Sequence, residues 1–164
     1  MVFLTLGSQK FQFNRLLKAM DDFISNSVIN TEVFAQIGYS DYMPQHYSYE
    51  AFLDRESFAQ WEEKADIVLT HGGTGAIIGA VKKGKKVIAI PRLKQYGEHV
   101  DDHQLQIIDQ FKELGFIIPC YDVSQLPECF AAAQNFRVKE YISNTDTIIA
   151  DIEKFILDAG FLKG

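Results

Sequence analysis

Three histidines and two glycine-containing turns carry most of the chemistry that this sequence can offer. One turn is the run His71-Gly72-Gly73-Thr74-Gly75. Glycines in a turn let backbone N–H groups approach a ligand closely, which suits a phosphate group. Histidine titrates near neutral pH, so His71, His99 and His103 are candidate general bases. These residue types predict an anion-binding turn with titratable side chains around it.

The glycine run stands between segments of different periodicity. A short apolar run covers 66–70, a helix-like segment covers 76–84, and a second apolar run covers 87–90. Strand, turn, helix and strand in this order indicate a parallel βαβ unit. The helix N-terminus then adds partial positive charge to the turn. The spacing fits neither the dinucleotide fingerprint nor the P-loop. A second interpretation is therefore equally compatible with the sequence: a tight turn between strand and helix in which the glycines are needed only for packing.

The chain begins with a similar unit. Residues 2–6 read as a buried strand, the turn Gly7-Ser8-Gln9 follows, and apolar residues recur at helical spacing from Phe13 to Ile24. Because the carboxyl ends of parallel strands meet at one edge of a sheet, we expect this turn and the turn at 72–75 to face one crevice.

The remaining segments continue the alternation of strands and helices. We expect further strands at 33–37, near 47–52 and at 116–119. We expect helices through 58–65, from Asp101 to 114, at 126–136, and a final one at about 143–160. This pattern predicts a single domain over 1–164, of α/β class, with a doubly wound, mostly parallel, Rossmann-like sheet.

Composition limits the classes of partner. The 164 residues carry a formal net charge of −6, with a pI of about 5.2, which argues against nucleic acid as the main partner. No apolar run approaches the ~18 residues of a membrane span, and the first residues do not read as a signal peptide. The cysteines, Cys120 and Cys129, lack zinc-site spacing, so we expect free thiols in a reducing cytoplasm.

Several motifs taken together are more specific than any one of them. They are the residues 2–7, 36–38, 65–75, Pro91 and Asp101-Asp102-His103-Gln104. As a set they resemble the C-terminal domain of glycosyltransferase family 28, over the chain to about Phe155. The likeness is greatest to the small split form, in which the sugar-nucleotide half is a separate polypeptide. Examples are the two-subunit UDP-GlcNAc transferase of the dolichol pathway and bacterial capsule and exopolysaccharide β-1,4-galactosyltransferases.

The resemblance implies half of a GT-B fold that binds a UDP-sugar donor. A membrane-anchored partner subunit would supply the other half and the lipid-linked acceptor, so this chain would lie peripherally at the cytoplasmic face of the membrane. We expect transfer of a sugar, galactose first, in capsule or exopolysaccharide synthesis. The alternatives are a UDP-GlcNAc transferase subunit and a non-catalytic nucleotide-sugar-binding module. A flavodoxin-like phosphate-binding protein is a third possibility.

The same resemblance assigns residues to the donor. It implies that the donor-binding set is Gly7, Ser8, Gln9, Gly72, Gly73, Thr74, Gly75, Glu98, Asp102 and Gln104. Family members often grip the ribose with an acidic residue where this chain has Gly79, and Glu98 is the expected replacement. Asp101 and Asp102 are adjacent, so they do not form a paired metal motif on one helix face. We therefore expect a metal-independent, inverting hexosyltransferase without a cofactor. The base is His71, His99 or His103, or a residue of the partner.

Overall fold

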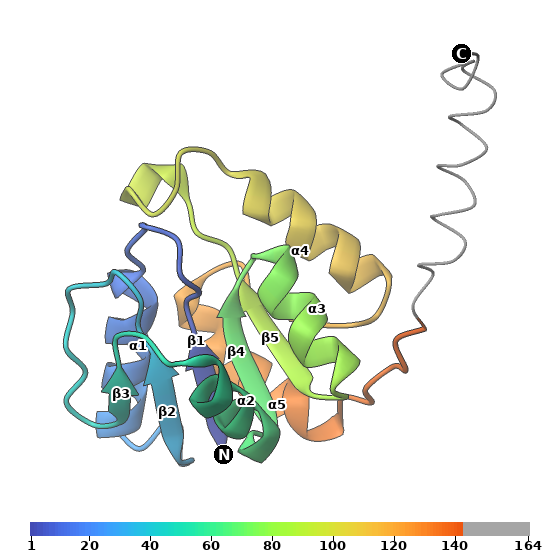
Figure 1. The fold of residues 1–164 in the computed structure, drawn as a ribbon, viewed down its shortest axis with the longest axis horizontal. Helices are drawn as coiled ribbons and strands as arrows, with labels where there is room; N and C mark the ends of the chain where they lie inside the picture. Colours follow the sequence, from blue (N-terminus) through green and yellow to red (C-terminus); the bar gives the residue numbers. More distant parts are fainter. Residues whose placement is uncertain (143–164) are drawn as a thin grey trace.

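The computed structural model describes residues 1–142. Its centre is a sheet of six strands, all of them parallel, in the order β3-β2-β1-β4-β5-β6 (Figure 1). The strands are β1 (Val2–Thr5), β2 (Val33–Gln36), β3 (Ser48–Glu50), β4 (Ile67–His71), β5 (Lys86–Ile90) and β6 (Ile118–Pro119). The predicted α/β class and doubly wound, parallel sheet are confirmed.

Helices cover both faces of the sheet (Figure 1). They are α1 (Asn14–Ser25), α2 (Arg55–Lys64), α3 (Thr74–Lys82), α4 (His103–Glu113) and α5 (Leu126–Asn135). Alternating side chains of β1 pack on opposite faces, because successive residues of a strand point to opposite sides. Val2 and Leu4 join a buried cluster with α1 and α5. Phe3 joins a second cluster with residues of α2, α3 and α4.

The chain reverses its direction of travel across the sheet between β3 and β4. It steps outward from β1 to β2 and β3, then returns to place β4 on the other side of β1. Thr5 and Thr70 are level in the register, and Thr70 Oγ1 donates a hydrogen bond of 2.9 Å to the Thr5 carbonyl. The turns after β1 and β4 therefore start side by side, at the point where open α/β sheets bind ligands.

Some element boundaries differ from those predicted. The helix expected from Asp101 begins at His103, because the Asp101 carboxylate accepts the His103 N–H at 3.0 Å and caps the helix from outside. The strand expected at 116–119 is confined to β6, since Gly115 adopts a φ of +74° and the Phe116 N–H turns back to the Phe111 carbonyl. The helix expected at about 143–160 lies outside the described residues.

Two further predictions from composition can be compared with the structure. Cys120 and Cys129 are both free and buried, as expected. Within residues 1–142, every helix is too short or too polar to span a bilayer.

Candidate functional site

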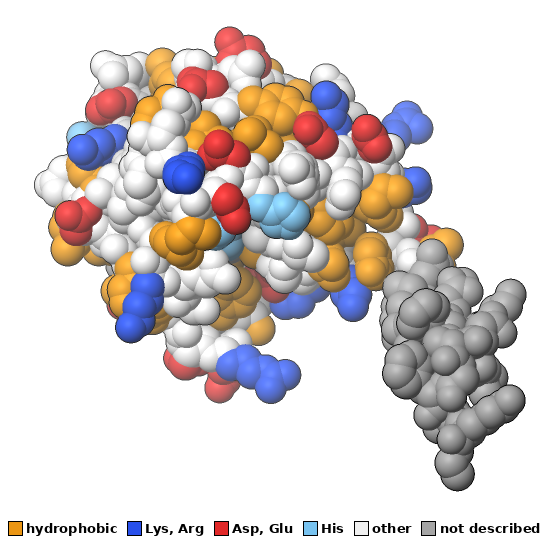
Figure 2. Space-filling model, turned by 90° about the horizontal axis from the view of Figure 1, so that it is seen from above, with side chains coloured by type: hydrophobic (Ala, Val, Ile, Leu, Met, Phe, Trp, Pro, Cys, Tyr) orange, Lys and Arg blue, Asp and Glu red, His pale blue; other side chains and the backbone are white. Residues whose placement is uncertain are grey.

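A cavity of about 510 Å³ opens at the carboxyl edge of the sheet, between the turns that follow β1 and β4 and the start of α4. We call it the loop cavity. The predicted site residues that line it are Gly7, Ser8, Gln9, His71, Gly72, Gly73, Thr74, Gly75, His99, His103 and Gln104. Figure 2 shows this face of the molecule from above, with histidine and acidic side chains close together near its middle. The two expected turns do share one site.

Two helices begin at the loop cavity. Gly73 precedes α3 and Asp102 precedes α4, and neither residue caps its helix with a side-chain hydrogen bond. The first turn of α3 has no acidic residue, whereas at α4 the Asp101 carboxylate already accepts the His103 N–H at 3.0 Å. The first N–H groups of a helix have no partner within it, and they carry the positive end of the helix dipole. The start of α3 therefore makes the loop cavity electrostatically suited to an anion.

The imidazole of His71 fills the space between the two turns. A Cβ atom added to Gly7 would stand 2.9 Å from His71 Cε1, and one added to Gly73 would overlap Nε2 even more closely. Burial, and next the charge of Arg92, lower the pKa of His71 to about 4. The ring is thus neutral at neutral pH, and its packing explains why glycines stand at positions 7 and 73.

Gln104 connects three segments around the cavity. Its Oε1 accepts hydrogen bonds from the backbone nitrogens of Gly72 and Arg92, each at 3.0 Å. A Cβ added to Gly72 would lie only 2.7 Å from the Gln104 Cβ. The acceptor end of this amide is committed to the backbone, so only its NH₂ group is left to offer to a ligand.

Arg92 is a buried residue that sequence reasoning missed. It is 1% exposed, and its Nη2 donates to the carbonyls of Leu6 at 2.9 Å and Phe11 at 3.1 Å, which flank the first turn. Its Nε and Nη1 are buried without a hydrogen-bond partner among the described residues. Burial lowers its pKa to about 10, so the guanidinium remains charged at neutral pH. The sequence feature that could have pointed to Arg92 is its position directly after a buried strand and Pro91.

Glu98 does not reach the loop cavity. Its side chain is fully buried, with its carboxylate oxygens 2.9 and 3.0 Å from Arg15 Nε and Nη2, and it accepts the Leu93 N–H at 2.9 Å. A carboxylate occupied in this way has no free face for a ribose, so the structure does not support the expected replacement for the acid missing at Gly79. Asp102 also lies outside the cavity lining, and its Oδ1 accepts the Lys94 N–H at 2.8 Å.

The two other histidines have different neighbours. His99 Nδ1 lies 3.1 Å from Asp101 Oδ1, and its ring packs against Phe11 with centroids 4.6 Å apart. His103 is exposed, and its Nδ1 lies 3.2 Å from Gln106 Oε1. Of these two histidines, only His99 therefore has a carboxylate that can orient its ring.

A second cavity of about 530 Å³ adjoins the first, and Gly7, Ser8, Gly75 and Ala76 line both. We call it the adjoining cavity. Its wall is largely apolar, with side chains of Phe52, Leu53 and Phe58 from the segment after β3 and from α2. Arg55, Glu62 and Gly79 also line it. Apart from Gly79, sequence reasoning did not find these residues, because nothing in their spacing ties α2 to the glycine turns.

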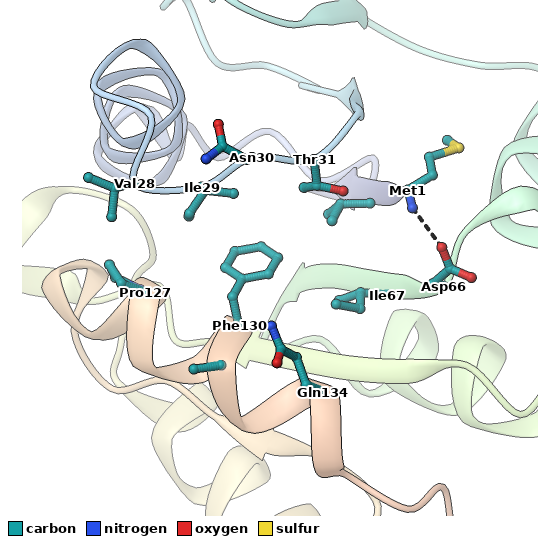
Figure 3. Close-up of a pocket in the computed structure, with 12 residues that line it drawn as sticks. Met1, Val28, Ile29, Asn30, Thr31, Asp66, Ile67, Pro127, Phe130 and Gln134 are labelled. Carbon is teal, nitrogen blue, oxygen red and sulfur yellow. Dashed lines mark hydrogen bonds and ion pairs between the residues drawn. The ribbon is translucent and has the colours of Figure 1, made fainter.

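A third cavity, of about 410 Å³, lies at the opposite edge of the sheet (Figure 3). The amino ends of β1 and β4, the segment 28–31 and α5 enclose it. Its only charged groups are the Met1 amino group and Asp66, which pair with each other at 2.6 Å. Within residues 1–142, no cluster of three or more His, Cys, Asp or Glu side chains is placed to hold a metal ion. Most of the predicted site residues line the two cavities at the carboxyl edge, which are therefore the functional candidates.

Comparison with known proteins gives this geometry a context. The family model described as "Glycosyltransferase family 28 C-terminal domain" matches residues 1–156. The human "UDP-N-acetylglucosamine transferase subunit ALG13" is 27% identical over 126 residues, which cover 73% of this chain and 11% of the relative. The Candida albicans protein of the same name is 29% identical over 96 residues, 58% of this chain and 27% of the relative. The chain thus corresponds to a minor part of the length of these relatives.

Solved structures of similar fold include glycosyltransferases. An NMR structure of ALG13 matches with a TM-score of 0.61 at 18% identity, covering 93% of this chain and 94% of that one. The crystal structure of MurG from Acinetobacter baumannii matches with a TM-score of 0.56 at 18% identity, covering 81% and 41%. The fold is that of one Rossmann-like half of a GT-B enzyme. From the family match over almost its whole length, the chain belongs to the glycosyltransferase family 28 C-terminal domain family.

Proposed function

We propose that this chain is the donor-binding subunit of a UDP-sugar glycosyltransferase. The observation that carries the proposal is the convergence of two glycine turns and the N-terminus of α3 on one cavity at the sheet's reversal point. Backbone N–H groups presented in this way are a suitable binding site for a diphosphate. Its continuity with an apolar cavity provides a place for the nucleoside attached to that diphosphate.

The adjoining cavity suits a nucleobase on chemical grounds. Phe52 is 47% exposed and packs edge-on against Tyr39 with ring centroids 5.0 Å apart. An exposed ring beside a cavity offers a surface on which a flat base can stack. The donor sugar, at the other end of the diphosphate, then lies toward the start of α4, where the Gln104 amide can donate to a hydroxyl.

Transfer of the sugar leaves a negatively charged nucleoside diphosphate. The N–H groups of the two turns, the dipole of α3 and the buried charge of Arg92 all favour this developing charge. These groups are fixed before the reaction, so no reorganisation is needed as the bond breaks. We propose that they replace a metal ion, and that the enzyme needs no cofactor.

Inversion at the anomeric carbon requires a base that takes a proton from the acceptor hydroxyl. We assign this role to His99, whose ring is oriented by Asp101 at 3.1 Å at the edge of the loop cavity. His71 is a weak base because its pKa is depressed to about 4, and its buried ring instead holds the two turns apart.

The names of the two relatives favour one of the two donor sugars. Both describe a subunit of a UDP-N-acetylglucosamine transferase. We therefore propose UDP-N-acetylglucosamine as the donor, in place of the galactose of capsule or exopolysaccharide synthesis that we expected first. The term subunit supports a second polypeptide, and we propose a membrane-anchored partner that presents a lipid-linked acceptor at the cytoplasmic face. Nucleic acid has no part in this proposal.

The direct test is transfer by a reconstituted pair. Membranes containing the partner subunit and this chain should move radiolabelled sugar from UDP-N-acetylglucosamine, in preference to UDP-galactose, onto lipid-linked acceptor. The chain alone should be poorly active on that acceptor. UDP binding without transfer by the pair would identify a non-catalytic binding module, and preference for a flavin would identify a flavodoxin-like protein.

A substitution in the turn tests the site itself. Gly73→Val drives a side chain into His71 and should abolish UDP binding in calorimetry. Ala132→Val adds the same kind of bulk at an exposed position of α5 and should bind UDP normally. Circular dichroism should show that both variants are folded. Normal UDP affinity in folded Gly73→Val would remove the turn from the site.

A further inference from the structure

Gly79 lies in the middle of α3 and lines the adjoining cavity, where it has no side chain to fill the space. Glycine weakens a helix interior, so its presence there calls for a local reason. Packing does not require it, because a Cβ at this position would meet its nearest neighbour at an ordinary contact distance of 3.8 Å. That neighbour is the Glu62 Oε1 atom. The glycine therefore leaves space between α3 and a carboxylate on α2.

Glu62 is unusual among the residues of its helix. It is 5% exposed, whereas the adjacent Glu63 and Lys64 are exposed to solvent. Its Oε2 lies 2.6 Å from Lys83 Nζ, which holds the carboxylate in one orientation. Its Oε1 is directed toward the gap over Gly79, and the residue lines the adjoining cavity together with Phe58 and Leu53. A charged group in such an apolar wall is costly unless it has a partner.

The ion pair with Lys83 accounts for one carboxylate oxygen only. Lys83 lies at the end of α3, and its side chain is 38% exposed. An ion pair with this lysine could form at the surface, so the pair does not by itself require the Glu62 carboxylate to be buried. A carboxylate held with one oxygen paired and the other facing a cavity is an acceptor for hydroxyl groups. Of the parts of a nucleoside diphosphate, the ribose adjoins the diphosphate and carries two neighbouring hydroxyls.

We propose that Glu62 is the residue that recognises the ribose hydroxyls of the donor. This inference rests on the proposed function, because it takes the glycine turns as the diphosphate site. Gly75 and Ala76 line both cavities, and Gly79 follows them in α3 one turn along. A donor with its diphosphate at the start of α3 therefore extends its ribose over Gly79 and onto the Glu62 carboxylate. Glu62 makes the site selective for ribonucleotides.

The test compares UDP with 2′-deoxy-UDP, using calorimetry on the full 164-residue chain. The unaltered chain should bind UDP at least about tenfold more tightly, the typical effect of leaving a buried acceptor unpaired. In Glu62→Gln, which keeps the size of the side chain, UDP should bind more weakly and the ratio between the two ligands should fall below about threefold. Glu63→Gln, a matched change at the next, exposed position, should keep the full ratio.

Lys83→Arg separates the identity of the lysine from ligand recognition. It keeps a positive charge beside the Glu62 carboxylate, so the preference for UDP should persist. Equal binding of the two nucleotides by the unaltered chain, or an unchanged ratio in folded Glu62→Gln, would overturn the role of Glu62. Loss of the preference in Lys83→Arg alone would show that the lysine, not the carboxylate, provides it. Failure of the unaltered chain to bind UDP at all would instead overturn the proposed function.

Discussion

The side-chain oxygen of Gln104 lies 3.0 Å from the backbone nitrogen of Gly72, although 32 residues separate them in sequence. The same oxygen lies 3.0 Å from the backbone nitrogen of Arg92. One amide thus joins the start of α4 to the turn after β4 and to the end of β5. The shape of the loop cavity depends on this connection.

Replacement of Gln104 by leucine should destabilise the protein. The N–H groups of Gly72 and Arg92 are buried and would lose their acceptor, at a cost of about 1–3 kcal/mol each. We expect the free energy of unfolding, measured with urea, to fall by roughly 2–6 kcal/mol. Gln104→Glu keeps an acceptor oxygen at this position and should lose less. Equal stability of Gln104→Leu and the unaltered chain would contradict the connection.

Arg92 should contribute to binding of the diphosphate more than to binding of the nucleoside. Its charge lies beneath the first turn, and its Nη2 holds the carbonyls at both ends of that turn. We expect Arg92→Met to weaken UDP binding by about tenfold or more in calorimetry and to leave uridine binding little changed. Arg92→Lys keeps the charge and should show a smaller loss. If Arg92→Met weakens both ligands equally, the residue acts by general packing instead.

His71 should make stability depend on pH between about 6.5 and 4. Burial and the charge of Arg92 depress its pKa to about 4 in the folded protein, whereas the unfolded chain titrates near 6.5. As the pH falls through this window, the unfolded state takes up the proton first, so stability is present above 6.5 and is lost on acidification. A shift of this size corresponds to about 3 kcal/mol.

The measurement is the urea unfolding free energy at a series of pH values. His71→Gln should flatten the decline between pH 6.5 and 4. It should leave the decline at lower pH, which the carboxylates with depressed pKa values such as Asp21 and Asp66 produce. A variant with the same slope as the unaltered chain in the upper window would show that His71 is not the group responsible.

His99 should matter for turnover and not for donor binding. In the reconstituted pair, His99→Gln removes the proposed base, and we expect kcat to fall by about a hundredfold with little change in the KM for the donor. His46→Gln is a matched control. His46 Nδ1 also lies 3.1 Å from a carboxylate, that of Asp21, but outside the two cavities. A His99→Gln enzyme with normal kcat would place the base elsewhere, on His103 or on the partner.

Local pattern was sufficient to predict the turns that line the loop cavity. The change from apolar runs to Gly7 and to Gly72 marks the ends of strands, and the helical spacing that follows fixes the direction of the next element. The reason for the glycines was not predictable. It is the ring of His71, which packs between turns that are separated by more than sixty residues in the chain.

Glu98 shows where local reasoning fails. In sequence it stands in a polar loop after a strand end, close to His99, and so looks available to a ligand. In the structure it is buried against Arg15 of α1, because burial of one charge requires the approach of an opposite one. Glu62 is the reverse case. It looks like part of a solvated helix face, and the packing of α2 against α3 brings it to a cavity.

The sequence by itself determined the alternation of strands and helices, the parallel sheet and the two glycine turns, because periodicity and glycine placement act over a few neighbouring residues. Only the tertiary structure decided which charged side chains serve the site. Arg92, Glu98 and Glu62 all lie near strand or helix ends, and their roles depend on which opposite charge or cavity the folded chain places beside each one. That pairing is a long-range property, and no local pattern encodes it.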